Sequence, residues 1–198
     1  MLRSLAPLLL CATMLSAIPL AAQTARPPSA QEAGNYPLDV AVTFQPMRGN
    51  SITAQSFWAW GGSVQVHGQF YRGLGVVADV AGTHTAAIDN TGVGLDMVTA
   101  VFGPRYTWAL PRSKCAVYAQ ALAGEANAFH GVFPTAAGAT SSSNSTALLV
   151  GGGFNLALTP RIALRALEAG WLRTGLPNST TGMQNNLRLG AGIVVRFR

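Results

Sequence analysis

The most constraining feature of this sequence is an alternation of apolar residues with polar or small ones, which recurs along most of the chain. In residues 186–198 it runs to the last residue, with apolar side chains at every second position and mostly Arg or Gly between them. Successive side chains of a β-strand point to opposite faces, so this period predicts a strand with one apolar face. Taken alone, the segment equally fits an edge strand of a soluble β-sandwich.

The same alternation predicts further strands, and it is clearest between Trp58 and Phe70. There Trp58, Val64 and Phe70 share one face, while Gln65 and His67 lie on the other. Together with the final segment, the chain is predicted to form strands at residues 36–45, 58–70, 74–81, 98–108, 115–128, 148–158, 163–173 and 186–198. Pro104 predicts a distortion or bulge, because proline removes a ladder donor. A change of parity after Arg165 predicts a bulge near Ala166.

The connections between these segments alternate between long and short. The long ones cover residues 48–56, 84–94, 129–144 and 174–185, and the short ones cover residues 71–73, 111–114 and 159–161. An up-and-down barrel in a membrane has short turns on one side and long loops on the other, and an even number of strands returns both termini to the short-turn side. A soluble sandwich has no reason to keep this rhythm. We therefore expect an all-β fold, an eight-stranded antiparallel up-and-down transmembrane β-barrel.

The composition fits a membrane barrel better than a soluble domain. Only 10% of the residues are charged, against about 25% in a typical soluble domain. After the N-terminal segment no charge-free apolar run is long enough for a transmembrane helix, but in a barrel only every second residue faces lipid. The net charge of +6 does not indicate nucleic acid, because the arginines lie in turns or inside strands and form no basic stripe.

The N-terminus reads as a targeting segment. Residues 1–22 combine an early Arg, an apolar run and a small-residue exit, which predicts a secretory signal peptide. Residues 23–35 are rich in Pro, Ser and Ala and predict a flexible periplasmic linker. The barrel is expected to occupy residues 36–198. It contains one cysteine, Cys115, and therefore no internal disulfide.

Polar side chains on the predicted inner face form a candidate interior network. Eight strands leave an interior just wide enough for side chains, so we expect these residues to plug it. Asp79 and Arg105 are expected to pair, since each lies a similar distance from a short turn. A gated narrow pore is the alternative to the plug. The network is predicted to contain Asp39, Gln65, His67, Asp79, Arg105, Gln120, Arg165, Glu168 and Arg188.

No catalytic, cofactor or metal site is predicted. His84 and His130 lie in expected outer loops with Asp89 and residues 141–143 available, as a lipid-modifying enzyme would require, but no spacing links them. His67 has no second His or Cys on its face and is not expected to hold a metal.

The strand pattern, the turn rhythm and the ending at Phe197 resemble the small eight-stranded bacterial outer-membrane barrels, such as the transmembrane domain of outer-membrane protein A and the opacity-type porin-like family. The resemblance covers about residues 36–198. It implies an integral outer-membrane protein with both termini in the periplasm, in contact with lipid and lipopolysaccharide. It also implies assembly by the outer-membrane barrel assembly machinery, with Phe197 as the assembly signal. It further implies a monomer with a structural or surface-interaction role for its extracellular loops. A narrow low-conductance pore and a lipid-modifying enzyme remain the alternatives.

Overall fold

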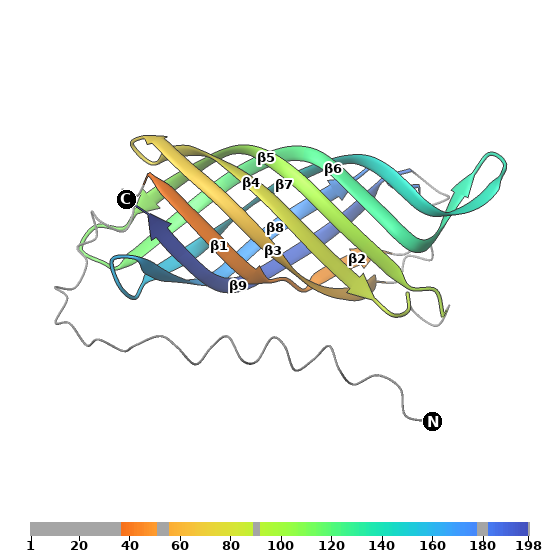
Figure 1. Ribbon diagram of the computed structural model, residues 1–198, viewed down its shortest axis with the longest axis horizontal. Coiled ribbons are helices and arrows are strands. Elements are labelled where there is room, and N and C mark those ends of the chain that lie inside the picture. Colours follow the sequence, from red (N-terminus) through yellow and green to blue (C-terminus); the bar gives the residue numbers. More distant parts are fainter. Residues whose placement is uncertain (1–36, 51–55, 89–91, 178–181, 198) are drawn as a thin grey trace, which may run out of the picture.

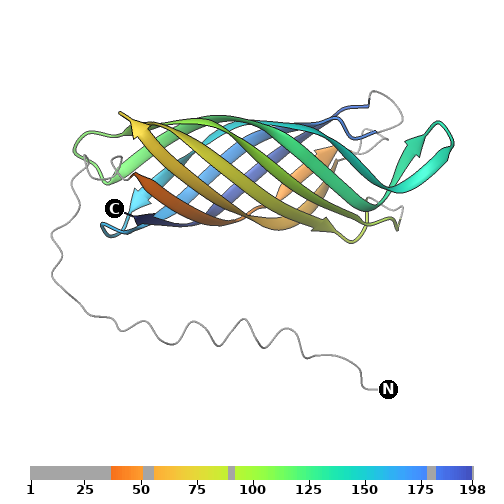
Figure 2. The same cartoon turned by 45° about the horizontal axis from the view of Figure 1, so that its top comes forward.

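The computed structural model describes residues 37–50, 56–88, 92–177 and 182–197, which form one closed antiparallel sheet. Figures 1 and 2 show the strands winding obliquely around a common axis, with the C-terminus at the end that carries the short turns. The strands are β1 Leu38–Phe44, β2 Met47–Asn50, β3 Ser56–Tyr71, β4 Leu74–Thr85, β5 Leu95–Ala109, β6 Cys115–Thr135, β7 Gly138–Ala157, β8 Ile162–Thr174 and β9 Gln184–Phe197.

The strands β1 and β2 are two halves of one barrel stave. Both pair with β3 on one side and with β9 on the other, and they are separated only by Gln45 and Pro46. Proline has no backbone N–H and therefore interrupts the ladder. Every stave pairs with its neighbours in sequence, and β1 closes the ring with β9. The eight-stranded up-and-down barrel is confirmed, but the expectation that residues 48–56 are entirely loop is wrong, because β2 continues the first stave.

The two predicted irregularities have different outcomes. The pairing of β8 shifts by one residue at Ala166 toward both β7 and β9, so the predicted bulge is confirmed. Around Pro104 the ladder to β6 is interrupted, but the register is the same before and after the gap. Pro104 therefore interrupts the ladder without adding an unpaired residue, so the expected distortion is confirmed in the form of a gap and not of a bulge.

The longest expected loop is mostly strand. Residues 129–144 belong largely to β6 and β7, which extend as a hairpin beyond the rest of the barrel (Figure 1). The register shifts between Phe129 and Phe133, and His130 there has a positive φ of 59°. The Ser- and Thr-rich part of this sequence reads as a loop because it has no alternation of apolar and polar residues. Backbone pairing between the two strands still makes it regular.

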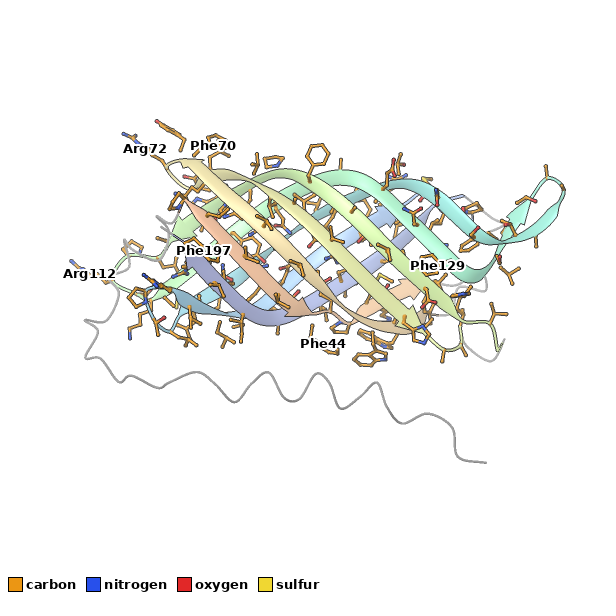
Figure 3. The ribbon with its side chains drawn as sticks, viewed as in Figure 1. Phe44, Phe70, Arg72, Arg112, Phe129 and Phe197 are labelled. Carbon is orange, nitrogen blue, oxygen red and sulfur yellow. The ribbon has the colours of Figure 1, made fainter. Side chains whose placement is uncertain are left out.

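The outer surface of the barrel is largely apolar. Large exposed side chains cover it along its length, among them Phe102 at 71% exposed and Phe70 at 66%. Figure 3 shows such side chains pointing away from the ribbon, with Phe70 and Phe197 near the short-turn end and Phe44 further along. Aromatic rings gather toward both ends, as in the stacked pair of Trp58 and Trp60 and the tilted pair of Tyr106 and Trp108. Among the described residues, no helix is long and apolar enough to cross a membrane.

Candidate functional site: the barrel interior and the loop-side rim

The centre of the barrel interior is organised around the side-chain amide of Gln65. Its nitrogen donates to Asp79 Oδ2 at 2.7 Å and to Glu168 Oε1 at 2.8 Å. Its oxygen accepts from Arg105 Nη2 and from Arg165 Nη1. An amide is both donor and acceptor, so this one residue links two buried acids to two buried guanidinium groups.

Asp79 and Arg105 do not pair directly, so the ion pair expected between them is wrong. Asp79 instead accepts from Arg188 Nη2 at 3.1 and 3.2 Å. Arg105 Nε donates to Gln120 Oε1 at 2.9 Å, and Arg105 Nη2 donates to Gln65 Oε1. The reason is the strand stagger: Asp79 lies opposite Val101 on β5, whereas Arg105 lies opposite Gly75. In a tilted barrel, an equal count from two different turns does not give equal height.

Glu168 is the second acidic centre of the interior. It accepts from Arg165 Nη1 at 2.7 Å and from the hydroxyl of Tyr118 at 2.6 Å. The bulge at Ala166 makes this possible, since Arg165 and Glu168 would otherwise point to opposite faces. The ring of Tyr118 also lies 4.3 Å from the guanidinium carbon of Arg105 and 4.8 Å from that of Arg165.

Tyr118 was missed by the sequence prediction, although its parity with Gln120 on β6 was the available signal. Gln45 was likewise omitted from the predicted network, and its Oε1 accepts from Arg188 Nη2 at 2.6 Å. Toward the short turns, the His67 ring contacts Asp39 Oδ2 at 2.7 Å, and Asn155 accepts from Arg165 Nε. Every predicted network residue lies in the interior: Asp39, Gln65, His67, Asp79, Arg105, Gln120, Arg165, Glu168 and Arg188.

A second, apolar layer lies in the interior on the loop side of this network. Its members come from nearly every stave and include Met47, Phe57, Leu95, Met97, Leu122, Phe133, Leu149 and Leu172. Leu122, Leu149 and Leu172 are almost completely inaccessible to solvent. The interior therefore changes from charged and hydrogen-bonded to apolar along the barrel axis. The sequence prediction concentrated on inward polar residues and did not identify this layer.

The two histidines expected in outer loops meet at one carboxylate on the outside of the barrel. His84 Nδ1 lies 2.5 Å from Asp96 Oδ1, and His130 Nδ1 lies 2.6 Å from Asp96 Oδ2. The hydrogen bonds from His130 and then His84 hold the pKa of Asp96 below its ordinary value of 3.8. Asp89, the acid named with them from the sequence, lies outside the described residues. Asp96 was missed because β5 starts at Leu95, whereas the strand was expected to start only at Val98.

This cluster does not assemble a nucleophilic triad within the described part of the chain. Such a triad needs a histidine in hydrogen-bond reach of a serine hydroxyl. Both imidazoles bond to Asp96, and none of the described serines is hydrogen-bonded to either ring. Among the described residues, no group of three His, Cys, Asp or Glu side chains is placed to hold a metal ion.

Comparison with protein-family models and with curated protein sequences finds no match to this chain. Comparison of structures does find similar proteins. Neisserial surface protein A (NspA) aligns with a TM-score of 0.59 and 19% identity, over 81% of this chain and 97% of that one. The attachment invasion locus protein (Ail) of Yersinia pestis, in complex with the heparin analogue sucrose octasulfate, aligns with a TM-score of 0.51 and 17% identity, over 79% and 97%. This chain therefore has the fold of these small barrels.

Proposed function

We propose that this protein is an integral outer-membrane β-barrel with a plugged interior, which acts as a structural or surface-interaction protein through its extracellular loops. The observation that carries the proposal is an inverted distribution of side chains. Large apolar residues cover the outside of the closed barrel, while buried Arg, Glu, Asp and Gln side chains bond to one another inside it. An apolar outer surface of this extent is unfavourable in water and favourable in a lipid bilayer. An apolar outside combined with a polar interior is the arrangement of transmembrane barrels.

The apolar surface has the form that a membrane requires. The outward residues of β5 are apolar or aromatic from Val98 to Trp108, and those of β9 from Leu187 to Phe197. Strands of about 10 residues tilted at about 40° span the apolar thickness of a bilayer. Among the described residues the ring is closed and every stave is paired on both sides, as a lipid environment requires. Outer-membrane lipid is thus the environment that this surface fits.

The interior supports the plug over the alternative of a narrow pore. An ion crossing the barrel has to separate the bonds that join Arg165, Glu168 and Gln65, and these groups are costly to leave unpaired. It then meets the apolar layer, where the buried leucines offer it no hydrogen bonds. Two barriers of different chemistry in series favour a closed interior, which leaves the loops and the β6–β7 hairpin as the functional surface.

The remaining parts of the proposal concern location and assembly. We propose that both termini lie in the periplasm, with the short turns, and that the hairpin lies outside the cell. Residues 1–22 and 23–35, predicted as the signal peptide and the linker, lie outside the described residues and stay predictions. A monomer assembled by the barrel assembly machinery is proposed on the resemblance alone. We infer no enzymatic role, and unchanged lipid A in the mass spectrum of a deletion strain tests that inference.

The plug is tested by electrical recording on purified protein. The protein in detergent should first give a β-rich circular dichroism spectrum and migrate differently on gels before and after boiling; a helical spectrum would reject the barrel. In a planar bilayer the wild type should show at most small and rare openings. Glu168→Ala, which removes the acceptor for Arg165 and Tyr118, should open more often, whereas the surface variant Arg112→Ala should not. A steady large conductance in the wild type would favour the pore over the plug.

A further inference from the structure

The outward side chains change from apolar to polar at a common level on the loop side of the barrel. We call the first polar outward positions of the staves the loop-side rim. Its described members are Arg48, Ser56, His84, Asp96, Glu125, Thr146, Arg173 and Asn185. Because every one of them directly follows the apolar surface, the rim marks the height at which lipid headgroups would begin.

Charge is distributed unevenly around this rim. Its acidic members, Asp96 and Glu125, lie on the adjacent strands β5 and β6. Its arginines, Arg48 and Arg173, lie on β2 and β8, on either side of β9. In the ring of staves β9 is opposite β5. The described rim therefore has a basic side and an acidic side, and an anion is drawn to the basic one.

The strand pairing gives the basic side a definite order. Arg48 is paired with Trp58 on β3 and with Leu187 on β9, and Leu187 is in turn paired with Trp171 on β8. These side chains form one row across four strands, and Arg173 is the next outward residue beyond Trp171. The spacing of strands and residues in a sheet separates the Cα atoms of Arg48 and Arg173 by roughly 12 Å. We call Arg48, Trp58, Trp171, Arg173 and Leu187 the basic rim patch.

The members of this patch are exposed, and both arginines have a side-chain contact. Trp58, Trp171 and Leu187 are 44%, 43% and 45% exposed, and both arginines are exposed as well. Arg48 Nη2 donates to the hydroxyl of Ser56 at 2.8 Å, and Arg173 Nη2 contacts the sulfur of Met183. These contacts hold each guanidinium near the surface while the bond to Ser56 uses only one of several donors on Arg48.

We propose that the basic rim patch binds the phosphorylated sugar headgroup of a glycolipid, lipopolysaccharide in the outer leaflet. Guanidinium groups bind phosphate in a bidentate manner, and two arginines set apart from one another suit phosphates at the two ends of a disaccharide. The indole rings offer flat faces to the sugar rings, and Leu187 with the apolar surface beneath it receives the acyl chains. This inference rests on the proposed membrane location and adds to it a ligand class and a site.

The test is native mass spectrometry of the full mature barrel, released from a zwitterionic detergent and titrated with purified bis-phosphorylated lipid A. The variant Arg48→Gln/Arg173→Gln should bind it at least about tenfold more weakly than the wild type. The matched control is Arg72→Gln/Arg112→Gln, which removes two exposed arginines at the short-turn end (Figure 3) and should bind as the wild type does. Lipid A stripped of its phosphates should bind the wild type and the rim variant equally weakly.

Several outcomes would overturn the proposal. An equal loss in the control variant would show a general effect of net charge, and no loss in the rim variant would exclude the patch. Phosphatidylglycerol binding that falls as much as lipid A binding would show a site for any anionic lipid. Arg48→Lys/Arg173→Lys should recover part of the affinity, because lysine keeps the charge without the bidentate geometry. Each variant must still migrate differently on gels before and after boiling, which shows that its barrel is folded. If the wild type itself showed no such difference, the proposed membrane barrel would be rejected.

Discussion

At the scale of single residues, the interior depends on which charged group pairs with which. Asp79 and Arg188 are in direct contact, whereas Asp79 and Arg105 share only the intervening amide of Gln65. Asp79, Arg105 and Arg188 are all almost fully buried. Breaking a buried pair on one side leaves a charge without a partner, so the identity of the pair has a measurable effect on the free energy of unfolding.

We predict that Asp79→Ala and Arg188→Ala each lower the free energy of unfolding by about 3 to 5 kcal/mol. Once one partner is lost, losing the other removes an unpaired charge, so the double variant should lose clearly less than the sum. Urea unfolding in lipid vesicles measures both effects. The comparison cycle of Asp79→Ala with Arg105→Ala should show a smaller coupling. Additive losses for Asp79 and Arg188, or a larger coupling to Arg105, would contradict the pairing.

Much of this interior could be predicted from parity, but its contacts could not. Alternation along a strand places Gln65, Asp79 and Arg105 on the inner face, because period two fixes the direction of each side chain. Contacts across the barrel depend on strand stagger, which no single segment encodes. Tyr118 shows a further limit, since an aromatic residue on the inner face reads as packing although its hydroxyl donates to Glu168.

At the scale of strands, the sequence predicts irregularities where apolar parity changes and fails where both faces are alike. The bulge at Ala166 was predicted because Arg165 and Glu168 are both polar and have opposite parity. The β6–β7 hairpin and β2 were not predicted, since the Ser- and Thr-rich part of the hairpin has no alternation of apolar and polar residues and β2 is only four residues long. Backbone pairing with a longer neighbour, rather than their own alternation, makes these segments strands.

The closing strand leads to a prediction about assembly. Phe197 lies on the outer face of β9, is 45% exposed and is paired with Leu38 where β9 closes the ring with β1. Deleting residues 197 and 198, or introducing Phe197→Ser, should reduce the amount of barrel in the outer membrane several-fold through degradation of unassembled chains. The control is Phe70→Ser on β3, also exposed and near the same end. Equal yields for the Phe197 and Phe70 variants would exclude a special role for the terminal aromatic.

At the scale of the whole molecule, the fold was predictable because two independent patterns agree. Alternation gives the number of staves, and the long-short rhythm of connections gives their up-and-down order. The structure adds closure through β1 and β9, and it places the short turns and the C-terminus at one end of the barrel (Figure 1). The rhythm also predicts which end faces the cell exterior, because outer-membrane barrels have short turns on the periplasmic side and longer loops outside.

We predict that the end with the β6–β7 hairpin faces outward. Two exposed positions suit a cysteine probe: Ser142 on the hairpin and Arg112 in a short turn. The other loop positions expected to face outward, Ser51, Asp89 and Ser179, lie outside the described residues. In a Cys115→Ala background, Ser142→Cys should react with an impermeant maleimide on whole cells. Arg112→Cys should react only after the outer membrane is permeabilised, because short turns face the periplasm. Whole-cell labelling of Arg112→Cys, with protection of Ser142→Cys, would invert the orientation.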